Sequence, residues 1–299
     1  MSIVNKTLLT LLLLNLSANI LQASPRLVRY TFTITNEGRE FVKETNFYVA
    51  APQEHLELKT NHSYKKTEDY VGNQLLSFKL TNIAPRGTKI ITVSAKINSS
   101  EEKKQLGKSL KEFVLPQDKI ESQAKEIVEK AKALKKSNDR ETVKVIYKWV
   151  KEHLRFSHYE KKLKGALWAY KNTRGDCTEH ACLTAALCRS LAIPAKVVSG
   201  FVMKKDGVLR AERAHDWAEV LINGKWRVVD SHGQKFMTDK DDYIAFRTLS
   251  ASEASPLRGL RRYQINRQKL TAQMGCRMSA RLAEALRPGK VRGRCASCK

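Results

Sequence analysis

The 299-residue sequence lacks an internal repeat, a low-complexity tract and, after its first residues, any hydrophobic run long enough to span a membrane. These absences exclude a repeat solenoid and a protein with several membrane spans. The apolar share of 42% is ordinary. We therefore expect most of the chain to fold, as two modest domains that each have their own core.

Acidic residues are scarce, because 30 Asp and Glu stand against 55 Lys and Arg, for a net charge of +25. Such an excess predicts attraction to anionic polymers or surfaces, and an anionic envelope polymer is the partner that the charge favours besides a substrate. The chain has no recognisable nucleic-acid-recognition motif, so we expect no specific nucleic-acid partner. Charge leaves the chemistry and the oligomeric state open.

Cysteines number only six, and their spacing differs from that of a small disulfide-stapled scaffold. They form two groups, one on a predicted helix and one in the tail: Cys177, Cys182 and Cys188, and Cys276, Cys295 and Cys298. The tail group has one C-x-x-C pair but no second pair and no nearby histidine. This favours a disulfide or plain tail cysteines over a zinc site. We predict no metal and no cofactor.

Residues 1–23 have the features of a signal peptide. Lys6 precedes an apolar run from Leu8 to Leu14, and a small-residue stretch ends at Leu21-Gln22-Ala23. The run is short for a membrane span. We predict cleavage before Ser24 and an exported protein, periplasmic or secreted, with an uncleaved membrane anchor as the alternative.

Strand patterns dominate residues 24–100, where apolar and polar residues alternate in short runs between turn signals. Several short strands at this spacing predict a small domain resembling a β-sandwich. Residues 101–137 are predicted as a helical linker, because apolar residues recur there at helical spacing. Residues 138–250 read as helices followed by strands, and residues 251–299 as a basic tail.

Cys177 is the candidate nucleophile. Asp176 is a good N-cap, and Glu179 three residues later completes a capping box, so Cys177 occupies the first position of a helix. The free amides and positive dipole end there favour a thiolate and can hydrogen-bond an oxyanion. The two carboxylates oppose this effect, so a base is still required. The alternative is a buried, inert cysteine, which we expect for Cys182 and Cys188.

His215 is the candidate base. Asn223-Gly224 between two β-rich runs predicts a two-residue hairpin turn, whose register sets Trp217 opposite Asp230. His215 lies two residues before Trp217 on the same face, so Asp230 is its diagonal neighbour at roughly 5.5 to 8 Å. The carboxylate can then hold the imidazole in one tautomer. Trp217 is close enough to line the site as a substrate contact. The alternative is an ordinary histidine at a strand start and an aspartate at a strand end.

Several blocks between residues 140 and 235 resemble the transglutaminase-like superfamily, in the right order: Gly175-Asp-Cys-Thr-Glu-His-Ala181, Ile193-Pro-Ala-Lys-Val-Val-Ser-Gly-Phe201, His215-Asp-Trp-Ala-Glu-Val220 and Trp226-Arg-Val-Val-Asp230. The resemblance implies an α+β fold, with a papain-like core over residues 138–250 behind the β-rich domain. It assigns Cys177 as nucleophile, His215 as base and Asp230 as orienting acid. It implies no calcium requirement, because the calcium sites of the animal enzymes have no counterpart here.

Family members attack a peptide or carboxamide carbonyl and form a thioester acyl-enzyme. The resemblance implies a peptide or protein substrate and favours hydrolysis by a cysteine protease or amidase; the alternatives are a protein-glutamine transamidase and a non-catalytic envelope-binding protein. The animal enzymes use an upstream tryptophan for the oxyanion, for which Trp149 and Trp168 are candidates. One departure is that Ser231-His232-Gly233 follows Asp230, where the family often has Pro-Thr.

Overall fold

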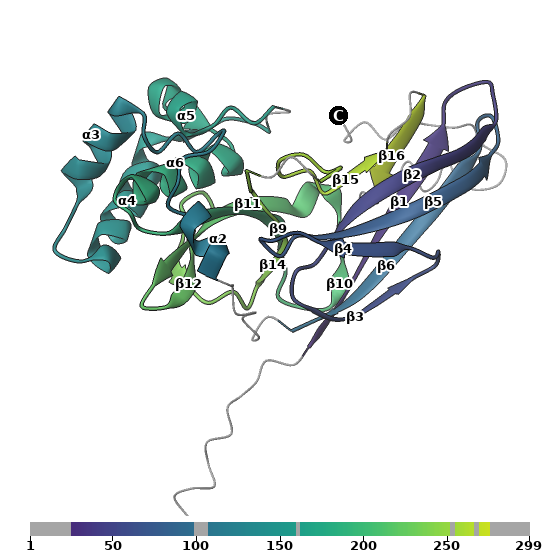
Figure 1. Cartoon of the computed structure of the whole chain (residues 1–299), viewed down its shortest axis with the longest axis horizontal. Coiled ribbons are helices and arrows are strands. Elements are labelled where there is room, and N and C mark those ends of the chain that lie inside the picture. Colours follow the sequence, from purple (N-terminus) through teal and green to yellow (C-terminus); the bar gives the residue numbers. More distant parts are fainter. Residues whose placement is uncertain (1–24, 99–106, 160–161, 252–254, 266–268, 276–299) are drawn as a thin grey trace, which may run out of the picture.

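The alternating pattern of residues 26–97 supplies most of the strands of two sheets that pack face to face (Figure 1). One has the order β10-β1-β6-β3, with β16 also paired to β1, and the other has the order β15-β2-β5-β4. Inward-facing rings such as Phe32, Phe47 and Phe78 are fully or almost fully buried between the sheets. The first six strands are β1 (Arg26–Asn36), β2 (Val42–Ala51), β3 (His55–Thr60), β4 (Lys65–Glu68), β5 (Gln74–Ile83) and β6 (Thr88–Ile97).

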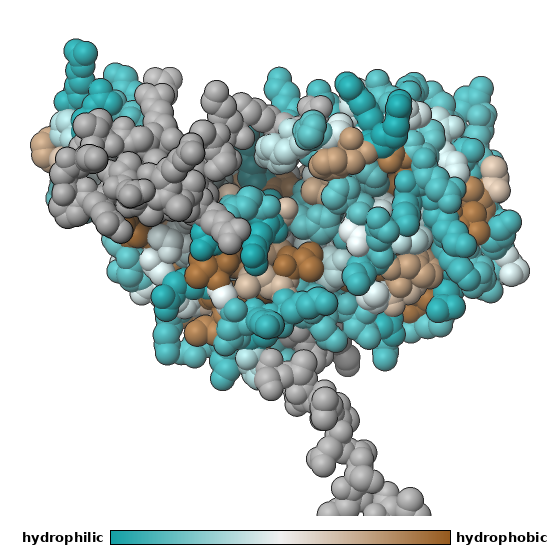
Figure 2. All heavy atoms as spheres, turned by 180° about the vertical axis from the view of Figure 1, so that it is seen from behind, coloured by the Kyte–Doolittle hydropathy of each residue, from teal (hydrophilic) through white to brown (hydrophobic). Residues whose placement is uncertain are grey.

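This computed structural model describes residues 25–98, 107–159, 162–251, 255–265 and 269–275. The predicted signal peptide and the three tail cysteines lie outside these ranges. Within them, no helix has both the length and the apolar character needed to cross a membrane. The surface seen in Figure 2 is mainly hydrophilic, with small separate hydrophobic patches. A hydrophilic surface agrees with the strong excess of charged residues.

Two strands of the sandwich come from the segment that the sequence predicted to be a tail. β15 (Tyr263–Ile265) pairs with β2, and β16 (Leu270–Met274) pairs with β1. Leu270 and Met274 point into the sandwich core, where each is less than a tenth exposed. The prediction of a basic tail from residue 251 is therefore corrected, because alternate apolar side chains in this segment complete the sandwich.

The second body is a five-stranded antiparallel sheet of order β13-β12-β11-β9-β14, with helices packed on one face (Figure 1). Its strands are β9 (Ala195–Val202), β11 (Ala214–Ile222), β12 (Lys225–Asp230), β13 (Lys235–Thr238) and β14 (Tyr243–Thr248). The helices are α2 (Gly107–Glu112), α3 (Lys125–Leu134), α4 (Asp139–His153), α5 (Ala166–Asn172) and α6 (Cys177–Ser190). Short elements complete the fold: β7 (Arg155–Phe156), β8 (Arg174–Gly175), β10 (Gly207–Val208) and η1 (Ala211–Arg213). The predicted α+β class and the β-rich region before the core are confirmed.

Helix α6 is the centre of the helical layer. It is buried along most of its length, and Cys182 and Cys188 are fully buried, as expected for inert packing cysteines. Helix α3, inside the predicted linker, contributes Ile127 and Ala131 to the same hydrophobic core. This part of the predicted linker therefore belongs to the helical layer, because its apolar stripe packs on the helices rather than spanning a gap.

The hairpin of β11 and β12 has the predicted register. Leu221 pairs with Trp226 and Ile222 with Lys225, and the pairing continues to Ala218 and Val229. Asn223 and Gly224 both have positive φ, of 52° and 73°, as a tight hairpin turn requires. This local turn sets which residues of β12 stand beside the start of β11.

A buried ion cluster crosses the sheet. Lys196 of β9 and Lys240 approach the same oxygen of Glu219 at 3.1 and 3.2 Å, and the Trp217 indole donates to the other oxygen at 3.1 Å. Burial alone would raise the pKa of Glu219, but the two lysine charges and these hydrogen bonds lower it to about 2. The ammonium of Lys196 also lies 4.4 Å from the centre of the Trp226 ring. Glu219 is therefore charged and is the shared partner of two lysines and an indole.

Substituting Glu219→Ala should lower the free energy of unfolding by about 3–5 kcal/mol, because the buried Lys196 would lose its ion-pair partner and Lys240 would lose one carboxylate while keeping Glu54 at 3.8 Å. The control is Glu44→Ala, which removes one partner of the exposed Lys79–Glu44 pair at 2.8 Å. That change should cost about 0–1 kcal/mol. Urea denaturation of both variants measures the difference, and equal losses would contradict a structural role for the buried cluster.

Candidate active site

The start of α6 is built as the sequence predicted. The Asp176 carboxylate accepts a hydrogen bond from the Thr178 amide at 2.8 Å, and the Glu179 carboxylate accepts one from the Asp176 amide at 3.2 Å. A Cβ on Gly175 would lie 2.3 Å from that of Glu179, so only glycine fits before the cap. The capping box fixes Cys177 as the first residue of the helix.

Cys177 lies against the start of β11. The backbone amide of Asp216 contacts its sulfur, and the Thr178 hydroxyl donates to the Asp216 carboxylate at 2.6 Å. Burial of the thiol, together with the charges of Asp216 and Asp176, raises the pKa of Cys177. Hydrogen bonds from the Asp216 amide and Thr178 lower it without reversing the shift. The resting group is therefore a thiol, and the helix start alone does not make it a thiolate.

His215 and Asp230 are brought together by the hairpin register. The distance from His215 Nε2 to Asp230 Oδ2 is 2.6 Å. Asp230 is 2% exposed and also accepts hydrogen bonds from the Gly233 amide at 2.6 Å and the Tyr243 hydroxyl at 3.0 Å. Burial would raise the pKa of Asp230, but His215 and these donors lower it. A charged Asp230 can only accept, so Nε2 carries a proton, and in a neutral imidazole Nδ1 is then the acceptor nitrogen.

The turn after Asp230 explains the departure from the Pro-Thr pattern. Gly233 donates its amide to Asp230, and a Cβ at that position would lie 2.2 Å from the carboxylate oxygen. Ser231-His232-Gly233 therefore wraps around the acid and holds it. The local sequence differs, but the aspartate stays fixed beside the histidine.

Trp217 has a different place from the one predicted. Its side chain is 1% exposed, so a substrate cannot touch it, and the predicted substrate contact is corrected. The indole lies nearly parallel to the His215 ring at 6.3 Å and meets the edge of Tyr243 at 4.9 Å. The physical reason is that Trp217 belongs to a buried cluster with side chains from neighbouring strands of the same sheet: Val198, Val228, Tyr243 and Ala245. Trp217 thus supports the histidine from the buried side.

The two tryptophans considered for an oxyanion role both pack elsewhere. Trp149 stacks on His153 at 4.2 Å, and Trp168 lies beneath the guanidinium of Arg174 at 5.6 Å. These contacts fit the packing role that helical spacing already suggested for them.

Sequence reasoning missed His232 and Tyr243. The His232 ring lies 5.6 Å from that of His215 and 5.4 Å from that of His180, which is one turn into α6. His232 follows Asp230 by two residues, so its position in the same turn was a usable signal. Tyr243 is placed by the pairing of β14 with β9, and no pattern in the neighbouring sequence predicts that pairing.

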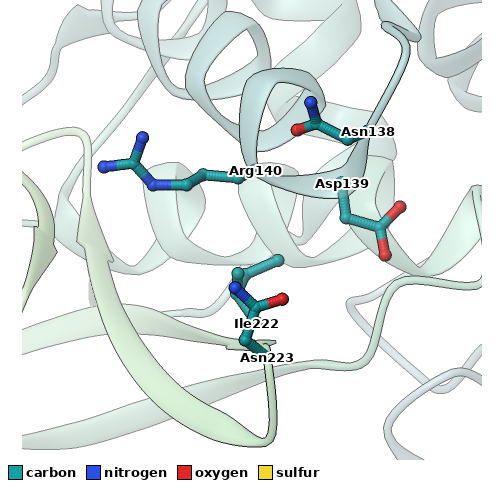
Figure 3. Close-up of a pocket in the computed structure, with 5 residues that line it drawn as sticks. All are labelled: Asn138, Asp139, Arg140, Ile222 and Asn223. Atoms are coloured by element: carbon teal, nitrogen blue, oxygen red, sulfur yellow. The ribbon is translucent and has the colours of Figure 1, made fainter.

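The described residues contain no cluster of His, Cys, Asp and Glu that could hold a metal ion. An open hollow of about 460 Å³ lies between the start of α4 and the hairpin turn, lined by Asn138, Asp139, Arg140, Ile222 and Asn223 (Figure 3). The hairpin turn is at the opposite end of β11 from His215. This hollow therefore lies apart from the histidine–aspartate pair.

Comparisons with known proteins identify a matching family and similar structures. The model of the transglutaminase-like superfamily matches residues 123–231, which contain Cys177, His215 and Asp230. A candidate cysteine protease from Cytophaga hutchinsonii has a similar fold, with a TM-score of 0.57 at 16% identity over 84% of this chain and 90% of that chain. The periplasmic domain of TgpA from Pseudomonas aeruginosa aligns with a TM-score of 0.36 at 16% identity, over 70% of this chain and 88% of that chain.

A search of curated proteins gave no significant match. The family model nevertheless covers the helices and strands from α3 to β12, and the first of these structures has a similar fold. The chain therefore contains a domain of the transglutaminase-like superfamily.

Proposed function

We propose that Cys177, His215 and Asp230 form the triad of a cysteine hydrolase that cleaves peptide or carboxamide bonds. The observation that carries the proposal is the 2.6 Å contact between His215 and a buried, charged Asp230, beside the strand start on which Cys177 rests. A carboxylate in this position keeps the imidazole in the tautomer that can accept a proton. The signal-like residues 1–23 support an exported enzyme, periplasmic or secreted.

The raised pKa of Cys177 bears on how the reaction begins. His215 Nδ1 takes the thiol proton as the sulfur attacks the carbonyl carbon, so the base acts during attack rather than beforehand. The amide of Cys177, at the helix start, is the donor that we assign to the oxyanion. His215 then protonates the departing amine, and a thioester remains. Water attacks the thioester with His215 as base, which releases the acid and restores the thiol.

An amine in place of water would make the protein a transamidase, and the triad is the same for both outcomes. A second candidate function has a specific observation in its favour. A thiol beside two carboxylates is poorly reactive, which favours a non-catalytic envelope-binding protein. Turnover and thiol reactivity separate these candidates.

The protein from Ser24 onward should cleave members of a mixture of N-acetylated peptides and carboxamides, followed by mass spectrometry. Cys177→Ala should abolish turnover, and His215→Gln should lower it about 10²–10⁴-fold because the general base is lost. Cys188→Ala is the control, a buried cysteine of the same helix. A labelled primary amine in the mixture reports transamidation. Turnover that survives Cys177→Ala would refute the proposed nucleophile.

The pH dependence of thiol reactivity tests the electrostatics of the site. Asp216→Asn removes a negative charge that raises the pKa of Cys177, so alkylation of Cys177 by iodoacetamide should extend to lower pH. Each unit by which the pKa falls gives about tenfold more thiolate below it. Glu212→Gln, an exposed acid before β11, should leave the profile unchanged. Identical profiles for Asp216→Asn and the parent protein would show that this charge does not act on the sulfur.

A further inference from the structure

One aromatic side chain beside the site remains largely exposed. Phe156 is 60% exposed although its strand, β7, is paired with β8. The pairing sets Phe156 beside Gly175, two residues before Cys177, and the Ser157 amide donates to the Gly175 carbonyl at 2.9 Å. The main chain around Phe156 is therefore fixed directly beside the segment that leads into the nucleophile helix.

Ring contacts connect Phe156 to the histidine. Its ring lies 5.0 Å from that of His232, which in turn lies 5.6 Å from that of His215. Burial and the neighbouring His215 lower the pKa of His232, so its ring is neutral at neutral pH. Phe156 and His232, which we call the aromatic rim, form a weakly polar edge in contact with the proposed base.

The exposed charged side chains next to the aromatic rim are basic, whereas the two carboxylates nearest His232, Asp176 and Asp230, are buried. Arg155 and Arg174 are exposed and face each other across β7 and β8. Lys235 is exposed, and it is the β13 residue opposite Asp230 in the backbone register of β12 and β13, at the end of the turn that carries His232. No acidic residue occurs in β7, in β8 or in the turn from Ser231 to Gln234. A ligand that extends beyond the rim along β7 and β8 would come close to basic side chains.

We propose that the aromatic rim is a substrate-binding surface, which takes an apolar side chain of a peptide next to the reacting carbonyl, with acidic residues flanking it. The proposal rests on the proposed function, since it names the substrate class of the same site. An apolar side chain laid on Phe156 removes exposed hydrophobic surface from water, while carboxylates further along the peptide meet Arg155 and Arg174.

Peptidyl chloromethyl ketones are the probe, because they need no known substrate. The Cys177 sulfur displaces chloride, so a C–S bond forms, the C–Cl bond breaks, and the thiol proton passes to His215. Compounds with Leu, Phe or Ser at each of the first two positions from the reactive carbon, and with Glu or Lys beyond them, report KI and kinact separately. Iodoacetamide, which offers no side chain, measures the reactivity of the thiol alone.

The parent protein should bind the best Leu or Phe compound with a KI about tenfold below that of its Ser counterpart. Phe156→Ser should erase this preference without changing kinact or iodoacetamide reactivity, and Phe156→Leu should keep most of it. Phe41→Ser is the matched control, because Phe41 is 62% exposed but precedes β2 of the sandwich. Glu compounds should bind better than Lys compounds, and Arg155→Glu should reverse that order.

A preference that persists in Phe156→Ser, or no preference at all in a protein whose Cys177 reacts, would overturn the binding surface and leave the proposed triad standing. If neither iodoacetamide nor the ketones label Cys177 in a His215-dependent way, the proposed function itself fails, and this inference fails with it. The two failures are thus distinguishable in one set of reactions.

Discussion

The carboxylate of Glu219, buried in the middle of the sheet, is the partner on which several separate parts of the molecule depend. It faces the ammonium groups of Lys196 and Lys240 and accepts the indole hydrogen of Trp217. Trp217 lies under His215 and against Tyr243, whose hydroxyl donates to Asp230. This carboxylate therefore faces the buried Lys196 and shares Lys240 with Glu54, and it orients the ring on which the histidine rests. The desolvation cost of such a cluster is offset only while every member keeps its partner.

Charges of opposite sign lie near Cys177. Asp216 raises the pKa of the thiol, yet the same carboxylate lies 3.7 Å from the Arg262 guanidinium, which also donates to Ser199 at 2.6 Å. Arg262 comes just before β15, in the segment that the sequence analysis assigned to a tail. The segment that leads into a sandwich strand thus supplies a cation to the surroundings of Cys177. Because burial and the carboxylates raise the pKa of Cys177, the proposed reaction would depend on a well-held base.

What the sequence predicted correctly is local. The capping box around Asp176 and the turn at Asn223-Gly224 each depend on a few neighbouring residues, and together they place Cys177 at a helix start and His215 beside Asp230. The strand period also put Trp217 on the same side as His215. It could not reveal that Tyr243 packs against Trp217, because β14 lies outside the hairpin.

The positions that sequence reasoning missed come from pairings between distant segments. Tyr243 reaches Asp230 because β14 lies on β9, and Arg262 reaches Asp216 because β15 joins β2. Hydrogen bonds from the sandwich also hold β14. The backbone amide of Gln53 donates to the Ala245 carbonyl at 2.8 Å, and the Asn73 side chain makes two hydrogen bonds with the backbone of Thr248. Since β14 carries Tyr243, which packs against Trp217 and donates to Asp230, the sandwich is part of the support of the histidine–aspartate pair. The family model stops at residue 231, before both β14 and β15. The unit able to hold the site in this geometry is therefore larger than the matched domain and includes both bodies.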